Sequence, residues 1–280
     1  MTALSPLVLT LLAAIGLIGG IGITAVGPGG VLPTIGLFAL TSLSPAAVAG
    51  TAIVTHIATG TAGTLAYTGS GQLRDPATRR TALILSATAL VGTPVGIAAN
   101  THVSTHLFGV LLGGFAVVVA ILVWVRTARP STRAAATADP GRDTATHHTP
   151  GDAAHDTAGD NPHPSIALLI PIGLAISVAA GIVGIGGPML TVPLLVSLRV
   201  PVLEALAAAQ ASSIVIATVG TIGYALHGSI DWPLALLVGV PEVAGVALGW
   251  KIANALPARK LAVALVVTLL VLAPYLALHH

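Results

Sequence analysis

The sequence contains no cysteine and few charged residues, and both shortages narrow what the protein can be. Without cysteine the chain cannot form disulfides, use a thiolate nucleophile or bind a metal through sulfur. Only 7% of its 280 residues are charged and 55% are hydrophobic, whereas about a quarter of the residues are charged in an ordinary soluble domain. This composition excludes a soluble globular domain.

Catalytic and nucleotide-binding motifs are missing as well. The chain has no H-E-x-x-H or G-x-S-x-G pattern and no G-x-x-x-x-G-K-[ST] sequence for ATP. An intramembrane enzyme that uses His56 and the serines near residue 212 therefore has no supporting motif, and we expect no enzyme and no cofactor. The net charge is only +2, and the basic residues flank apolar runs instead of forming a patch, so we expect no nucleic-acid partner.

Long apolar runs make up most of what is present. Two runs, 30–43 and 187–199, are too short to span a bilayer comfortably and follow glycine clusters, so we expect broken or re-entrant helices there. The pattern predicts an all-α polytopic membrane protein embedded in the lipid bilayer. The ten predicted segments lie near residues 6–26, 30–43, 46–69, 80–99, 104–125, 165–183, 187–199, 203–227, 233–250 and 259–277.

A polar stretch divides the chain into two membrane halves. Residues 127–163 are rich in Ala, Thr, Asp, Gly and Pro and have no apolar period, which predicts a disordered cytoplasmic linker between a first repeat (1–126) and a second (164–280). The linker histidines are irregularly spaced, so we interpret them as solvated and expect no metal site. These residues are His147, His148, His155 and His163.

The basic residues predict how the chain is oriented in the cytoplasmic membrane. If the loops that carry them are cytoplasmic, all 11 Lys and Arg residues fall on one side, as the positive-inside rule expects. Both termini then lie outside. The first basic residue is Arg74, so the apolar N-terminus lacks the basic region of a signal peptide, and we expect residues 6–26 to be retained as a helix.

The two halves resemble each other at a fixed spacing. The glycine cluster at 27–30 matches the cluster at 184–187 at an offset of 157, and 63–67 (GTLAY) matches 220–224 (GTIGY) at the same offset. Gly92 and Gly96 then match Gly245 and Gly249 at an offset of 153. Each half holds five segments, an odd number, so the copies start on opposite sides of the membrane. The sequence therefore predicts inverted repeats, whose broken helices build a midplane site in many secondary transporters.

The duplicated glycine clusters are candidate anion-binding loops. A glycine cluster at the start of a helix leaves backbone N–H groups unpaired, adds the positive end of the helix dipole and lets a ligand approach closely. We expect the two clusters to meet, with binding through Gly27, Gly29, Gly30, Gly184, Gly186 and Gly187. The alternative is that these glycines only allow kinks or close packing, the role that we expect for the GxxxG pairs 92/96 and 245/249.

At these residues the sequence resembles the sulfite exporter TauE/SafE family of membrane transporters. The resemblance rests on GIGGPMLTVPLL at 184–195, its weaker copy GPGGVLPTIGLF at 27–38, and the polar helix starts GTAIVTH at 50–56 and AAQASS at 208–213. It covers nearly the whole chain outside the linker. It implies transport of a sulfur-containing organic or inorganic anion, and the family name suggests export. In the first copy Pro28 interrupts the glycines.

A few polar residues fall inside predicted membrane segments. Glu242 is the only acidic one, so it is a candidate for proton coupling, with a permanently neutral carboxyl at the Pro241 kink as the alternative. Other side chains are candidates to complete the anion site, although interhelical hydrogen bonding would also explain them. These are Thr51, Thr55, His56, Gln210, Ser212 and Ser213. We expect Tyr67 and Tyr224 to act as anchors at the membrane interface.

Together these patterns favour a secondary transporter that moves a small anionic substrate by alternating access, with proton coupling through Glu242, and the resemblance implies sulfite or an organosulfonate as that substrate. A passive anion channel that uses the same helix-dipole loops is the alternative. Gly-rich helix faces allow a homodimer without specifying one.

Overall fold

The fold is seen in a computed structural model that describes residues 4–25, 28–128 and 164–253, and isolated positions between 263 and 274. Within these ranges the regular elements are all helical, which confirms the all-α class. In chain order they are α1 (Pro6–Ala25), the short 3-10 turn η1 (Pro28–Gly30), α2 (Val31–Leu40), α3 (Pro45–Gly69), the 3-10 turn η2 (Gln72–Arg74), α4 (Pro76–Asn100), α5 (Thr105–Ala128), α6 (Ile166–Val183), α7 (Pro188–Ser197), α8 (Val202–Leu226) and α9 (Trp232–Ala253).

The nine predicted segments that fall in the described ranges correspond one to one with these α-helices. The largest difference is at α4, which begins four residues earlier than predicted, because Asp75 accepts a hydrogen bond from the N–H of Thr78 at 2.7 Å and Pro76 occupies the first helical position. The predicted segment 259–277 lies outside the described residues except at isolated positions. The predicted linker 127–163 lies outside them after Ala128.

Six of the described helices, namely α1, α4, α5, α6, α8 and α9, are long and apolar enough to cross a membrane. The 25-residue helix α3 is as long but does not belong to this set, because it carries six threonines and His56. The short helices α2 and α7 have ten residues each and lie inside the bundle. In α2 every residue from Val31 to Phe38 is buried, so this helix packs against protein along most of its length.

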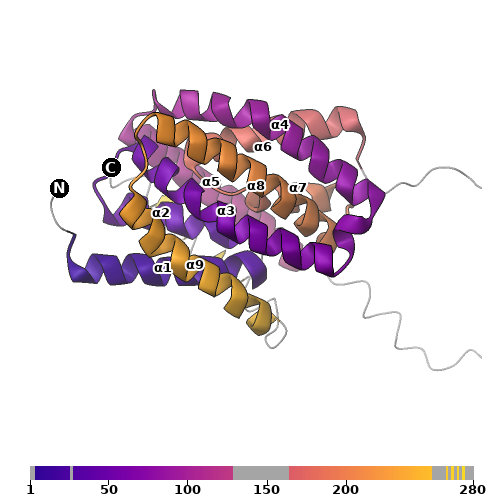
Figure 1. The fold of residues 1–280 in the computed structure, drawn as a ribbon, viewed down its shortest axis with the longest axis horizontal. Helices are drawn as coiled ribbons and strands as arrows, with labels where there is room; N and C mark the ends of the chain where they lie inside the picture. Colours follow the sequence, from indigo (N-terminus) through magenta and orange to yellow (C-terminus); the bar gives the residue numbers. More distant parts are fainter. Residues whose placement is uncertain are drawn as a thin grey trace, which may run out of the picture.

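The long helices form an elongated bundle in which two pairs flank a central pair (Figure 1). α1 packs along α9 on one side, and α4 packs along α6 on the opposite side. Between these pairs lie α3 and α8, which pack against each other. In the sequence repeat α1 corresponds to α6, α3 to α8 and α4 to α9. The α1/α9 pair of helices therefore corresponds to the α6/α4 pair.

Glycines bring the backbones of α1 and α9 into direct contact. A Cβ atom on Gly20 would collide with the carbonyl oxygen of Glu242, and one on Gly245 would collide with the carbonyl oxygen of Leu17. A side chain at either position would push the helices apart. The packing role predicted for Gly245 is confirmed.

The α4/α6 pair is built in the same way. A Cβ atom on Gly96 would collide with the carbonyl oxygen of Val178, and one on Gly181 would collide with the carbonyl oxygen of Thr93. Gly92 likewise faces Ser177 and the carbonyl oxygen of Leu174. The predicted packing role of Gly92 and Gly96 is therefore confirmed.

Individual contacts also recur between the halves. Gly245 contacts the carbonyl of Leu17 in the α1/α9 pair, and Gly92 contacts the carbonyl of Leu174 in the α4/α6 pair. The two glycines are 153 residues apart in the sequence, and the two leucines are 157 residues apart. These are the offsets of the sequence repeat. The duplication seen in the sequence thus extends to which helices meet and where they meet.

We expect Gly96→Ala to lower the melting temperature by several degrees in detergent, because a methyl group at the α4/α6 contact would cost about 1–3 kcal/mol of overpacking. Gly114→Ala on α5 is the matched control, since a Cβ there meets nothing within 4 Å. The control should melt at or slightly above the wild-type temperature, because alanine favours helix over glycine. Equal melting temperatures for the two variants would contradict the close packing.

Candidate functional site

The second glycine cluster forms a sharp turn between α6 and α7. Gly184 adopts a left-handed conformation (φ 72°), and its N–H bonds to the carbonyl of Ala180 at 2.8 Å, which ends α6. A Cβ atom at Gly184 would also collide with the backbone of Ala49 at the start of α3. Four residues after Gly184, Pro188 opens α7, where its fixed φ suits the first helical turn. The spacing from Gly184 to Pro188 thus produces a broken helix.

Side chains from three other helices hold this turn in place. The last carbonyl groups of a helix have no partner inside the helix, and here they accept hydrogen bonds from Tyr224 (Oη to Gly181, 2.5 Å), Asn100 (Nδ2 to Ile182, 2.5 Å) and Thr34 (Oγ1 to Gly184, 3.3 Å). Tyr224 is fully buried. Its predicted role as an interface anchor is therefore wrong, because its hydroxyl serves the end of α6.

The first glycine cluster continues through η1 into α2. Gly29 packs against α1, where a Cβ atom would collide with the carbonyl oxygen of Gly19 and the N–H of Ile23. Gly30 ends η1 and directly precedes α2. Gly27 lies outside the described residues.

The two clusters meet around the ring of His56, which α3 places between them. A Cβ atom on Gly30 would lie 2.9 Å from Cε1 of this imidazole, and one on Gly186 would lie 3.1 Å from its Cγ. Glycine at both positions therefore lets both loops approach one ring. The expectation that the duplicated clusters come together agrees with this geometry.

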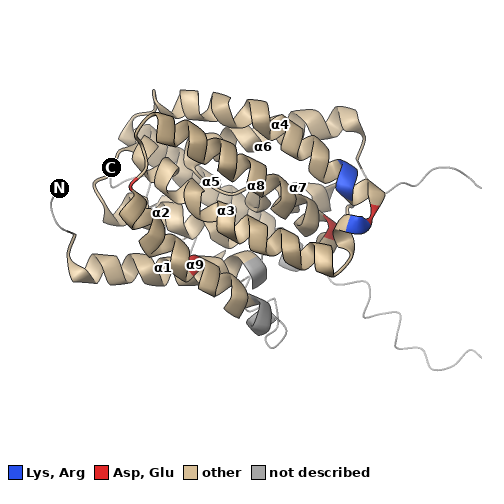
Figure 2. Ribbon diagram, viewed as in Figure 1, with Lys and Arg blue, Asp and Glu red and all other residues tan. Residues whose placement is uncertain are grey.

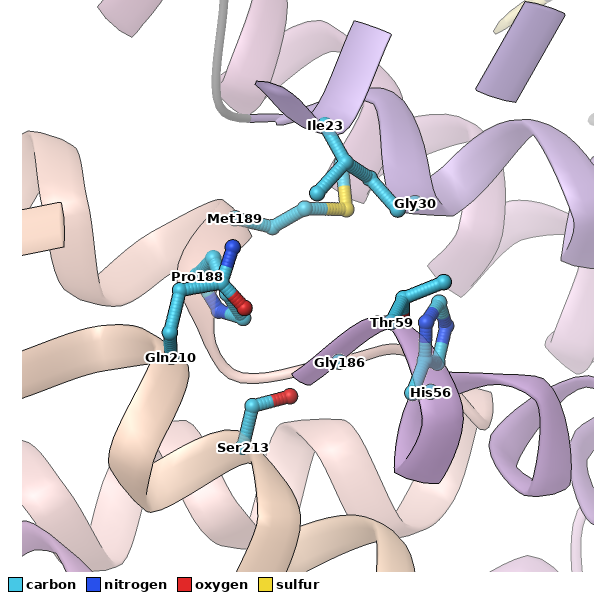
Figure 3. Close-up of a pocket in the computed structure, with 9 residues that line it drawn as sticks. All are labelled: Ile23, Gly30, His56, Thr59, Gly186, Pro188, Met189, Gln210 and Ser213. Carbon is cyan, nitrogen blue, oxygen red and sulfur yellow. The ribbon is translucent and has the colours of Figure 1, made fainter. Parts of the chain in front are cut away.

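A small buried cavity lies where the loops meet (Figure 3). His56 and Thr59 from α3 line one side, across from Gln210 and Ser213 from α8. The open space is about 10 Å³, which is room for about one water molecule. The remaining lining residues are Ile23, Gly30, Gly186, Pro188 and Met189.

The polar groups of this cavity suit an anion. Gly30 directly precedes α2 and Pro188 opens α7, so two helix N-termini with their positive dipole ends point at one small space. A hydroxyl, a carboxamide and an imidazole add hydrogen-bond donors from α8 and α3. The described part of the chain shows no cluster of three His, Asp or Glu residues able to hold a metal ion.

Glu242, on α9, lies next to His56. Its Oε1 is 3.6 Å from Nδ1 of His56, and the side chains are 0% and 3% exposed. The geometry gives neither carboxyl oxygen of Glu242 a hydrogen-bond partner among the described residues, and the same holds for Nε2 of His56. A carboxyl and an imidazole buried this close together can exchange a proton with each other.

The positive charges that Figure 2 shows lie at one end of the bundle. The Lys and Arg residues coloured in Figure 2 lie near the turn between α3 and α4, whereas an acidic residue is seen part-way along α9. In the described part of the chain, Glu242 is the only buried acidic residue and His56 the only buried histidine. Neutral dipoles and this pair therefore dominate the electrostatics at the cavity.

Of the residues predicted to bind the anion, five line the cavity: Gly30, Gly186, His56, Gln210 and Ser213. Apart from Gly27, which is not among the described residues, the others lie outside the lining. The Thr51 hydroxyl accepts a hydrogen bond from the N–H of Asp231 at 3.0 Å, and the hydroxyls of Thr55 and Ser212 donate to carbonyls of their own helices. Gly187 packs on α8. For these residues and for Gly29 and Gly184, packing or local hydrogen bonding explains the residue type.

Sequence reasoning missed several lining residues and the contact between His56 and Glu242. Thr59 is not among the missed residues, because the sequence places it beside His56 as a further candidate, one helical turn later on the same face of α3. Ile23, Pro188 and Met189 carry no polar signal. The pair depends on how α3 packs against α9, which no local pattern reports.

A family model described as "Sulfite exporter TauE/SafE" matches residues 12–276, nearly the whole chain. No curated protein and no solved structure matches it.

Two glycine-to-alanine variants can separate the cost of backbone strain at the α6–α7 turn from the cost of a steric collision there. Gly184 and Gly228 both have positive φ, but a Cβ at Gly228 meets nothing within 4 Å. Gly228→Ala should therefore cost only about 1–2 kcal/mol of backbone strain. We expect Gly184→Ala to melt at a clearly lower temperature, because the methyl group also displaces Ala49. Equal losses would show that the contact with α3 is unimportant.

Proposed function

Because the chain belongs to the sulfite exporter TauE/SafE family of membrane transporters, we propose that it is a secondary transporter that carries a small anion through the cavity around His56. The family assignment and the six apolar helices make it a multi-pass membrane protein of a transporter family, and the family is not one of enzymes. The substrate, we propose, is sulfite or an organosulfonate, and Glu242 takes up the coupled proton.

The observation that carries this proposal is the convergence of two helix N-termini on one buried space. An anion placed between Gly30 and Gly186 would face backbone dipoles from both halves and the donor groups of His56 and Ser213. The described helices bring no Lys or Arg side chain to the cavity. Such a site favours a small anion over a nucleotide, whose several phosphates need cationic partners.

The size of the cavity favours a carrier over a channel. About 10 Å³ of open space holds one water molecule, whereas sulfite has four non-hydrogen atoms. The loops must separate before such an anion can enter. A passive channel requires a continuous water-filled path, so a closed site between two movable halves fits alternating access better.

The repeat supplies a mechanism for this movement. We propose that the halves are inverted repeats that exchange their conformations, so that the cavity opens first to one side of the membrane and then to the other. The recurring glycine contacts of the α1/α9 and α4/α6 pairs support this, since equivalent surfaces allow equivalent movements. In the proposed orientation both termini face outward and the linker lies in the cytoplasm.

Adjacent serines on α8 provide a direct test of the site. Ser213 lines the cavity, whereas the hydroxyl of Ser212 donates to the carbonyl of Ala209 at 3.1 Å. In the wild type, we expect one sulfur oxyanion or sulfonate to raise the melting temperature more than chloride or acetate does. Ser213→Ala should weaken that binding by about tenfold, because one hydrogen bond to a charged group is lost, whereas Ser212→Ala should bind like the wild type.

The opposite ranking of the two variants would place the anion elsewhere. If no sulfur anion at millimolar concentration stabilises the wild-type protein, the proposed substrate class is wrong.

A further inference from the structure

The pair formed by His56 and Glu242 determines the net charge next to the cavity. Nδ1 of His56 faces Oε1 of Glu242 at 3.6 Å, while the same ring lines the cavity. With no proton the pair carries a charge of −1, with one shared proton it is neutral, and with two it carries +1. A net charge is costly to bury in a membrane protein, so the empty closed site is most stable when the pair shares one proton.

The surrounding helices offer no other ionisable group to balance a charge at the cavity. α1, α2 and α7 contain none. α8 contains Glu204 and Tyr224, each within one turn of an end, and besides His56 α3 contains only Tyr67. α9 adds only Lys251, in its last turn. Among the described residues, only the pair can change the charge of the buried site.

We infer that His56 and Glu242 together supply the positive charge that neutralises a singly charged anion in the cavity, so that one proton accompanies each monovalent anion and transport is electroneutral. This rests on the proposed function. The empty site is neutral with one shared proton. The loaded site is neutral with two protons on the pair and one negative charge on the substrate.

This balance selects substrates by charge. A divalent anion in the same site would leave a net charge of −1 buried in the membrane, so monovalent sulfonates and bisulfite are favoured over sulfate and doubly charged sulfite. The helix dipoles of the loops stabilise any anion locally, but they carry no net charge. They cannot replace the second proton when the loaded site crosses the membrane.

Each member of the pair has a distinct role that substitution separates. Glu242→Gln leaves a pair that is neutral or +1, so the anion can still be neutralised and its binding is linked to at most one proton. His56→Gln leaves a pair that is −1 or neutral and never positive. The two variants remove one ionisable group each but differ in whether the positive state exists.

Binding of methanesulfonate and sulfate, whose charges stay fixed, is the first experiment. We expect wild-type affinity for methanesulfonate to rise as the pH falls from about 8 to about 6, by up to about tenfold per pH unit for each proton taken up, and sulfate to bind at least about tenfold more weakly. Glu242→Gln should bind methanesulfonate like the wild type at the acidic end, with a shallower pH dependence at the alkaline end. His56→Gln should bind it at least tenfold more weakly throughout.

Flux into proteoliposomes with an imposed membrane potential is the second experiment. Wild-type uptake of methanesulfonate should acidify the lumen and should not respond to the potential. Any residual uptake by His56→Gln should respond to the potential, because its loaded site is negative. His102→Gln, at an exposed position outside the cavity, is the matched control and should behave like the wild type.

The outcomes distinguish a wrong charge balance from a wrong transporter proposal. If the wild type binds and carries an anion but sulfate equals methanesulfonate, or uptake follows the potential, the charge balance is wrong while the transporter proposal stands. Wild-type affinity in His56→Gln at acidic pH would also overturn it. If His56→Gln does not fold, Glu242→Gln still decides, since loss of acidic binding in that variant contradicts the assigned roles. If no anion binds to the wild type, both proposals fail.

Discussion

The approach of two glycine loops to one imidazole ring is the contact on which the rest of the site depends. Gly30 and Gly186 come so close to His56 that a single methyl group on either would press on the ring. The loops can take these positions because α6 ends in a left-handed glycine and because α1 and α9 touch through their backbones. Gly184 is needed for its left-handed conformation, whereas Gly30 and Gly186 are needed for their small size. Both properties of glycine are required to bring the two loops together.

Several glycine contacts recur between the two halves, but the polar groups do not. A Cβ atom on Gly63 would meet the side chain of Gln210, and one on the equivalent Gly220 would meet that of Ile53. The glycine surfaces are thus preserved while an amide in one half corresponds to an aliphatic chain in the other. His56 likewise corresponds to Ser213. The recurring glycine contacts determine how the helices pack, and the residues that differ give the cavity one polar wall from each half.

Much of the helical layout could be predicted from the sequence, because apolar runs, prolines and capping residues act over short distances. Because Asp75 caps α4, the helix begins four residues before the start predicted from hydropathy, which does not detect capping residues. The meeting of the glycine clusters could be predicted because the repeat places them in equivalent positions. What could not be predicted is which glycine faces the cavity and which faces a neighbouring backbone, as Gly186 and Gly184 do. That distinction, like the contact of His56 with Glu242, is set by tertiary packing.

The threonines of α3 have a mechanical consequence. From Thr55 onward, the hydroxyls of Thr55, Thr59, Thr61 and Thr68 donate to carbonyls of their own helix. These four hydrogen bonds lie within α3, so a shift or rotation of the whole helix would keep them. The end of α6, in contrast, is bonded to three other helices. Moving α3 would break its contacts at Thr51 and His56 but not these four threonine bonds, whereas moving the end of α6 would break hydrogen bonds to three helices.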